Sequence, residues 1–146
     1  MNTLFTIGYQ GRTIDGFIEM LQAHGVTHLI DVRQLPFSRK ADFSKRRLQA
    51  HLAAAAIDYT HLPDLGTPKA LRDEIRRTHD YEAFFQAMDE LLAQQPEALD
   101  AALAIVRAQP AALLCFEADY RECHRLSVAN AMQARASEPL EVVHLN

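Results

Sequence analysis

The chain has 146 residues, 49% of them hydrophobic, and a formal net charge of −4 at pH 7. This length and apolar content fit a single domain, residues 1–146, with one substantial core. The acidic balance argues against a general nucleic-acid coat protein, and no apolar run approaches the roughly 20 residues that span a bilayer. The first residues do not have the pattern of a secretory signal peptide. We therefore expect a cytoplasmic protein without membrane contact, in which Cys115 and Cys123 are free thiols.

The first half of the chain alternates strand and helix patterns. Residues 3–8 form a β-prone run, after which Thr13 caps a helix with apolar residues at i, i+3, i+4 and i+7 spacing. Residues 27–32 predict a second strand, followed by a polar loop. Ser44 is a plausible cap for the next helix, and residues 57–62 predict a third strand.

The second half continues the same alternation. A helical stretch follows, in which Asp80 caps one segment and Pro96 begins another. Residues 111–117 are almost continuously apolar, which is typical of a buried central strand. Asp119 and the glutamate three residues later have capping-box spacing and predict a helix that reaches about Arg135. Residues 140–145 predict a last strand.

This alternation favours one fold class. Strands that are separated by helices form crossover units, which are right-handed and place the strands parallel in one sheet. The sequence therefore predicts a three-layer α/β sandwich with about five mostly parallel strands and helices on both faces.

Unusual polar residues follow the predicted strands. The first strand is followed by Tyr9, Gly11 and Arg12. The second ends with Asp31 and Arg33, and its loop carries Ser38 and Arg39. The third ends with His61, and the fourth ends with Glu117 and is followed by Cys123, His124 and Arg125. Ligands of parallel sheets bind beyond the carboxyl ends of the strands. We therefore expect these side chains to gather into one site.

Four stretches carry a family resemblance: TIGYQGRTIDGF, HLIDVRQLPFSRKADFSK, IDYTHLPDLG and LLCFEADYRECHR. In this order they resemble the domain-of-unknown-function family 488, and together they cover most of the chain. The resemblance implies a single α/β domain with a polar edge. It implies no reaction, because the family is defined without an activity.

The loop after the second strand is strongly basic. Residues 33–47 carry six Arg and Lys residues against one Asp, which is typical either of a solvated face or of an anion-binding patch. Arg33 and Arg39 can clamp a phosphate or a carboxylate, and Ser38 can donate a hydrogen bond to it. The alternative for Arg33 is a structural ion pair with Asp31, which lies two residues away on the same face of the strand.

The turn that follows the first strand is a weaker signal. Gly8 and Gly11 flank the turn and allow backbone N–H groups to approach an anion, and Arg12 adds a positive charge. The segment has neither the dinucleotide-binding pattern nor a P-loop, so a simple tight turn remains the alternative.

The segment CFEADYRECHR is the strongest candidate for chemistry. Glu117 can transfer protons or activate water, and with Asp31 it forms a possible carboxylate pair for hydrolysis. A helix start favours the thiolate form of Cys123. The alternatives are a buried filler role for Cys123 and a structural ion pair between Glu117 and Arg125 or Arg33.

Two further interpretations of this segment are weaker. Cys115 to Arg121 spells C-x5-R, which resembles the anion-cradling loop of cysteine phosphatases and rhodanese-like sulfurtransferases, but Glu117 within it disfavours an anion. A metal site is not expected, because Cys123 and His124 would point about 100° apart on a helix.

The sequence thus favours an enzyme or binding domain, hydrolase-like, for a phosphate-bearing ligand such as a nucleotide or nucleic-acid component. In this interpretation Asp31, His61, Glu117, Cys123 and His124 are the catalytic candidates. The ligand-binding candidates are Tyr9, Gly11, Arg12, Arg33, Ser38, Arg39 and Arg125. The alternatives are cysteine-dependent sulfur or phosphoryl transfer and a non-enzymatic nucleic-acid-binding module. The sequence indicates neither a cofactor nor an oligomeric state.

Overall fold

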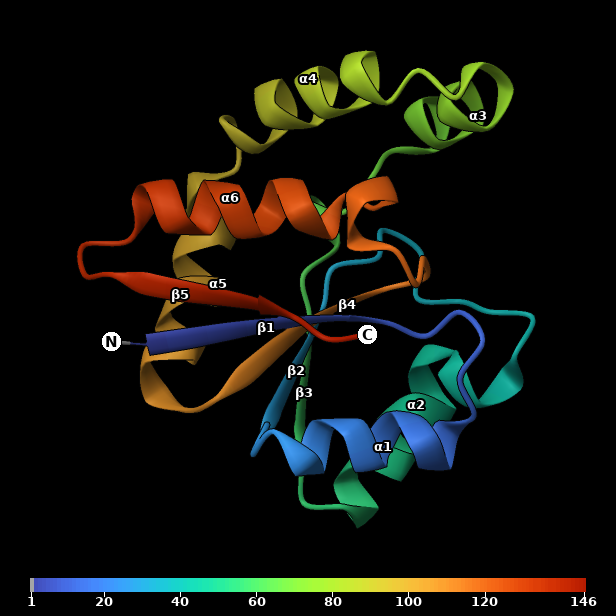
Figure 1. The fold of residues 1–146 in the computed structure, drawn as a ribbon, viewed down its shortest axis with the longest axis vertical. Helices are drawn as coiled ribbons and strands as arrows, with labels where there is room; N and C mark the ends of the chain where they lie inside the picture. The colour runs from blue at the N-terminus through green and yellow to red at the C-terminus, as the bar shows by residue number, and fades with distance from the viewer. Residues whose placement is uncertain (1) are drawn as a thin grey trace.

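The computed structural model describes residues 2–146, and its centre is a five-stranded parallel sheet (Figure 1). The strands are β1 (Asn2–Gly8), β2 (His28–Asp31), β3 (Asp58–His61), β4 (Ala111–Cys115) and β5 (Leu140–His144). Their spatial order is β3-β2-β4-β1-β5, and every neighbouring pair is parallel. The predicted α/β fold with a parallel sheet is therefore confirmed.

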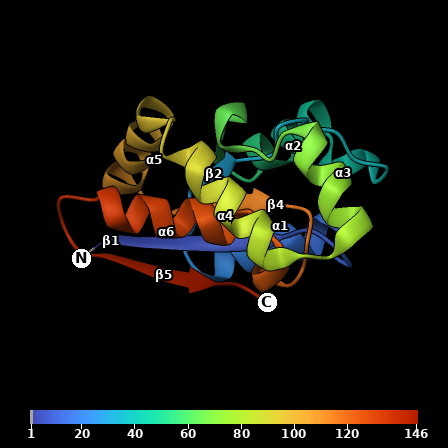
Figure 2. The same cartoon turned by 90° about the horizontal axis from the view of Figure 1, so that it is seen from above.

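Helices cover both faces of this sheet. They are α1 (Ile14–Ala23), α2 (Lys45–Ala54), α3 (Lys69–Thr78), α4 (Tyr81–Leu92), α5 (Pro96–Ala108) and α6 (Arg125–Arg135). Figure 1 shows α1 and α2 below the sheet and α6 above it, with α3 and α4 forming an outer arm beyond α6. In the view from above, α4 crosses α6 and α3 extends past it (Figure 2). The arm is attached through α4, which contacts α6.

Two apolar clusters fill the spaces between the layers. One joins α4, α5 and α6 to the sheet around Leu113, and the other joins α1 and α2 to the opposite face around Leu114. All five residues of β4 are buried, because this strand lies in the sheet interior with helices on both sides. This explains the continuous apolar run in its sequence.

Helix caps explain several element boundaries. The Thr13 side chain accepts a hydrogen bond from the Gly16 amide at 3.1 Å, and Asp80 accepts one from Ala83 at 3.1 Å. Ser44 occupies the N-cap position of α2, but its hydroxyl bonds with the backbone of Ser38 instead. Ser44 therefore ties the loop after β2 to the start of α2.

The segment after β4 differs from the sequence prediction. The strand ends at Cys115, and Asp119 caps a short 3-10 turn at Tyr120–Glu122 rather than a long helix. Helix α6 begins at Arg125. The Asp119 side chain accepts a hydrogen bond from the backbone amide of Arg121, two residues later. This bond closes a turn, so the capping-box spacing does not begin a helix here.

Helix α3 was not separately predicted. None of its residues is fully buried, and its apolar face is limited to Leu71 and Ile75, which are partly buried against the core around Leu113. Within residues 2–146, no helix combines the length and apolar character that a membrane crossing requires.

Candidate functional site

A pocket of about 600 Å³ lies at the carboxyl edge of the sheet. Its walls come from the loop after β2, from the end of β4 and the loop that follows it, and from α3 and the start of α4. The cavity thus lies at the sheet edge that the sequence analysis considered, and its volume is in the range of small-molecule sites, about 300–1,000 Å³.

Positive charge predominates on the pocket walls. The charged lining residues other than histidine are Arg33, Arg39, Lys40, Arg72 and Arg76, opposed by Glu117 and Glu122. Arg72 donates to the Gln34 side chain at 3.0 Å and to the Thr67 carbonyl at 2.8 Å. The guanidinium groups of Arg39 and Arg76 make no hydrogen bond or ion pair with any residue from 2 to 146. These two exposed groups are therefore available to a ligand.

Aromatic side chains surround the same space. Tyr9, Phe37, Phe116, Tyr81 and Phe84 all contribute to the lining. Phe37 is 75% exposed and Phe116 is 44% exposed, which is unusual for large apolar side chains. Tyr9, by contrast, is buried and stacks on Phe43 at 4.7 Å between ring centroids. The exposed phenyl rings can contact a planar ligand, whereas one face of the Tyr9 ring is already covered.

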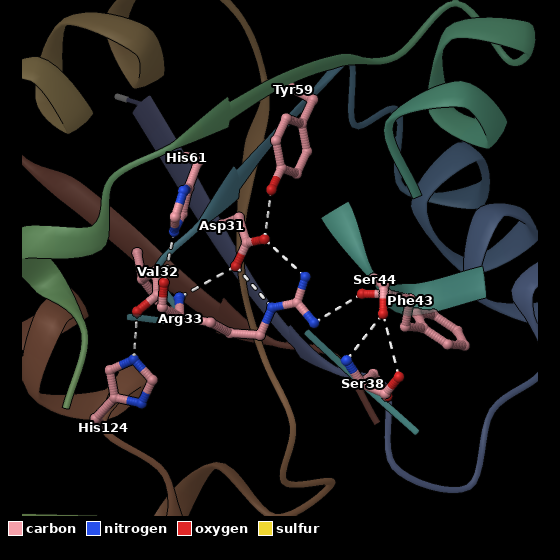
Figure 3. A network of polar contacts seen from close by, with 9 residues as sticks. All are labelled: Asp31, Val32, Arg33, Ser38, Phe43, Ser44, Tyr59, His61 and His124. Carbon is pink, nitrogen blue, oxygen red and sulfur yellow. Dashed lines mark hydrogen bonds and ion pairs between the residues drawn. The ribbon is translucent and has the colours of Figure 1, made fainter. Parts of the chain in front are cut away.

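Asp31 lies at the centre of a polar network (Figure 3), and its partner Arg33 also lines the pocket. Arg33 donates to its carboxylate through Nε at 2.9 Å, through Nη2 at 2.8 Å and through its backbone amide at 3.1 Å. The Tyr59 hydroxyl donates to the same carboxylate at 2.6 Å, and the remaining guanidinium nitrogen of Arg33 donates to the Phe43 carbonyl. The structural ion pair that was one of the two sequence interpretations is therefore present.

This network shifts the pKa of its members. Burial, together with the charge and hydrogen bond of Asp31, raises the pKa of Tyr59 well above its usual range. Burial lowers the pKa of Arg33, but its hydrogen bonds and ion pair with Asp31 outweigh burial and raise it overall. His61 bonds through Nε2 to the Arg33 carbonyl at 2.7 Å and lies outside the pocket lining. These groups hold the end of β2 against β3.

Arg125 is fully buried at the first position of α6. It donates to the carbonyls of Glu117 and Ala118 and, through Nε, to the Thr6 hydroxyl at 3.2 Å. Burial lowers its pKa to about 10. A carbon atom added to Gly8 would overlap the Glu117 carbonyl and approach the Arg125 guanidinium, so only glycine fits there. Arg125 therefore shapes the loop after β4 and does not line the pocket.

Glu117 projects into the pocket from this loop. Burial raises the pKa of its carboxyl group, although a backbone hydrogen bond and the charge of Arg125 oppose the shift. No residue from 2 to 146 forms an ion pair with Glu117, so the sequence alternative of a structural pair with Arg125 or Arg33 is wrong. Arg125 bonds to the backbone carbonyl of Glu117 instead. The carboxyl group can therefore exchange a proton with a bound ligand.

Cys115, Cys123 and His124 meet behind Glu117. The structure joins the two cysteines in a disulfide, so the expectation of free thiols is wrong. The turn between them brings the end of β4 and the start of α6 together. His124 bonds through Nε2 to the Val32 carbonyl at 2.8 Å, and burial lowers its pKa to about 4. The ring is therefore neutral near pH 7.

The structure brings together half of the residues that the sequence nominated. Those in the pocket lining are Tyr9, Arg33, Ser38, Arg39, Glu117 and His124. Those outside it are Gly11, Arg12, Asp31, His61, Cys123 and Arg125. Arg12 donates through Nε to the Gly8 carbonyl. Asp31, His61, Cys123 and Arg125 make the contacts within the protein that are described above.

Sequence reasoning missed the contribution of α3. Arg72 and Arg76 both line the pocket, and their four-residue spacing places them on one face of a helix. That spacing was the available signal. The basic segment at 33–47 also divides: Arg33, Arg39 and Lys40 face the pocket, whereas its last three cations lie in the first turn of α2.

The C-x5-R pattern does not form an anion cradle here. Arg121 pairs with Asp119 at 3.0 Å and does not line the pocket. The carbonyls of Glu117 and Ala118 point inward to Arg125. An anion-binding loop requires amide N–H groups in that place.

These features define the chain as a parallel three-layer α/β protein with a cationic, aromatic pocket at the carboxyl edge of its sheet. Residues 13–132 match the family model described as Domain of unknown function DUF488, and the chain belongs to this family. Neither a curated protein nor a solved structure gives a significant match.

Proposed function

We propose that this protein is an enzyme that binds a nucleotide or a similar phosphate-bearing ligand in the pocket and acts on it with the help of Glu117. The observation that carries the proposal is the combination of uncommitted guanidinium groups and exposed aromatic rings around one cavity. A nucleotide supplies the matching pair of features, an anionic group and a planar base.

The arginines support the phosphate half of the proposal. Arg39 comes from the loop after β2 and Arg76 from α3, so they approach the pocket from different elements. Guanidinium groups form paired, charge-assisted hydrogen bonds with phosphate oxygens. Arg33 and Arg125 were candidates for this role on sequence grounds, but their donors are already used within the protein.

The exposed phenyl rings support the base half. Phe37 and Phe116 belong to different loops that meet at the pocket, and both present apolar surface to solvent. Stacking of a base on an aromatic side chain contributes about 1–3 kcal/mol. We expect these two rings to contact the base.

Glu117 is the group we propose for proton transfer. It is the lining carboxylate that lies nearest the end of β4, and it makes no ion pair within residues 2–146. Asp31 cannot form the carboxylate pair considered from sequence, because its oxygens already accept bonds from Arg33 and Tyr59. The proposed hydrolase-like chemistry therefore depends on a single carboxyl group.

The test is calorimetric titration with AMP, GMP, CMP and UMP, with adenosine and inorganic phosphate as partial ligands. We expect at least one nucleotide to bind more tightly than either partial ligand. Arg76→Gln should weaken that binding by about tenfold or more, because it removes a charged hydrogen-bond donor. Arg77→Gln is the matched control, since Arg77 is the next residue on α3 and does not line the pocket.

Two results would overturn the proposal. One is the absence of binding by all four nucleotides, and the other is equal binding by Arg76→Gln and Arg77→Gln. Glu117→Gln separates binding from chemistry. It should leave the affinity within a few-fold of the wild type and abolish turnover of any nucleotide that the wild type hydrolyses.

A further inference from the structure

Three side chains of types that bind metals meet beside the pocket, and two of them, Cys115 and His124, line it. One ligand atom from each of Cys115, Cys123 and His124 lies within 4.8 Å of the others, and all three residues are buried. Thiolate sulfur and imidazole nitrogen are the ligands that zinc prefers. The sequence objection to a metal site does not hold here. Cys123 has an extended backbone and His124 is the N-cap of α6, so the two do not project from a regular helix.

The orientation of His124 suits metal binding. Its Nε2 is 2.8 Å from the Val32 carbonyl, which can only accept, so Nε2 carries the ring hydrogen. Nδ1 is then an acceptor, and it lies 3.7 Å from the Cys123 sulfur. Histidines that bind metals commonly donate their other N–H to a carbonyl or carboxylate, which fixes the ring.

Two donors beside the sulfurs favour thiolates, and one carboxylate opposes them, because Glu117 Oε2 lies 3.6 Å from the Cys115 sulfur. The backbone N–H of Arg125 lies 3.5 Å from the Cys123 sulfur, and the Arg125 guanidinium lies 3.6 Å from the Cys115 sulfur. Such donors stabilise negative charge on sulfur. The guanidinium has no carboxylate partner among residues 2–146, so a thiolate at Cys115 would give this buried cation a counter-charge.

The backbone spacing also favours a bridging ion. The Cα atoms of Cys115 and Cys123 are 7.3 Å apart, whereas disulfides usually span about 4.4–6.8 Å. Two thiolates that share a zinc ion are separated further, because each Zn–S bond is about 2.3 Å long. The pair can therefore hold a metal ion without drawing β4 and α6 closer together.

We propose that the reduced protein binds one Zn²⁺ through the thiolates of Cys115 and Cys123 and through Nδ1 of His124. A dithiol, or a phosphine together with water, supplies the two electrons and two protons that convert the disulfide into two thiols, and the dithiol or phosphine is oxidised. Metal binding then releases the two thiol protons to solvent. Because Cys115 and His124 line the pocket, the fourth coordination position is open to a ligand there. This arrangement of three protein ligands and one open position is typical of catalytic zinc.

The test uses the full chain after reduction with a phosphine and removal of the reductant without oxygen. Titration with Co²⁺ should reach saturation at one equivalent, with the intense visible bands of tetrahedral cobalt and a thiolate charge-transfer band. Zn²⁺ should displace the cobalt. His124→Gln should weaken binding by more than about 100-fold, since even the loss of an outer partner costs 10–100-fold. His79→Gln is the control, because His79 also lines the pocket but lies outside the cluster.

A second measurement avoids any variant. In the reduced wild type, Zn²⁺ should protect both thiols from iodoacetamide. The proposal is overturned by equal alkylation with and without zinc, by a disulfide that resists reduction in the native protein, or by equal cobalt binding in the two histidine variants. Zinc binding does not depend on the proposed function, so a protein that binds zinc but no nucleotide would refute only the latter.

Discussion

Two buried arginines lie at the same edge of the sheet, and only one of them has a charged partner. Arg33, 6% exposed, forms an ion pair with the fully buried Asp31 at 2.8 Å. Arg125 is fully buried and has no carboxylate within ion-pair distance among residues 2–146; its partners are carbonyls, a hydroxyl and a sulfur. The pKa of Arg33 is raised overall, whereas burial lowers that of Arg125 to about 10.

The difference separates a region whose charges are paired within the protein from one that holds an unpaired buried charge. Around Asp31 every strong donor has an acceptor inside the protein, so this region is complete without a ligand. Around Arg125 a positive charge lies beside sulfur atoms and near an unpaired carboxyl group, that of Glu117. Buried charges are stable only when paired or strongly hydrogen-bonded, so the second region has more to gain from a ligand or a metal ion.

The largest expected effect concerns the first region. Asp31→Asn should lower the free energy of unfolding by about 3–5 kcal/mol, because it leaves the Arg33 charge buried and unpaired. Urea denaturation measures the change. Asp42→Asn is the control, since Asp42 makes only exposed contacts with His51 and Arg47 and should cost about 1 kcal/mol or less. Equal losses in the two variants would refute the contrast.

A smaller effect is expected in the second region. Arg125→Met keeps much of the side-chain volume and leaves no carboxylate unpaired, but the Glu117 and Ala118 carbonyls lose their donor. The expected loss is about 1–3 kcal/mol. Arg121→Met, an exposed arginine in the same loop, should change stability little. If Arg125→Met cost more than Asp31→Asn, a hidden counter-charge would have to exist.

The smallest effect concerns the edge of the Asp31 network. Tyr59→Phe removes one hydrogen bond to the carboxylate and should cost about 1–2 kcal/mol near pH 7. Tyr81→Phe is the control, because no hydrogen bond of its hydroxyl to residues 2–146 is present.

The same pair of variants tests the pKa of Tyr59. Because the folded-state pKa is raised, the contribution of Tyr59 is fully present below its unfolded pKa of about 10. It is lost as the pH rises above that value towards the folded pKa. The difference in unfolding free energy between wild type and Tyr59→Phe should therefore shrink above about pH 10. A constant difference up to pH 12 would contradict the assigned cause.

Much of the fold could be predicted from sequence because its signals are local. The apolar run at residues 111–115 and the caps Thr13 and Asp80 each depend on neighbouring residues. The parallel sheet follows from the alternation of elements, and the pocket follows from the shared edge of the strands. These steps required no knowledge of side-chain geometry.

The sequence could not predict which of the candidate side chains line the pocket and which only make contacts within the protein. Asp31 and Arg33 lie on one face of β2, which permitted both a structural pair and a phosphate clamp, and only the rotamers decide between them. The contact of Cys115 with Cys123 depends on a turn whose capping pattern suggested a helix. Helix α3 packs on the core through Leu71 and Ile75 alone, both only partly buried, and two apolar positions are too few to place a helix beside the pocket.

The shallow packing of α3 has a consequence for how the pocket would open and close around a ligand. Because only Leu71 and Ile75 of α3 pack against the core, and both are partly exposed already, moving the helix outward exposes less apolar surface than moving any helix with fully buried residues. A ligand that contacts the arginines of α3 and also the loop after β2 would hold the helix in place. Amide hydrogen exchange along residues 69–78 should then be the fastest among the helices of the free protein and should slow most when the cavity is filled.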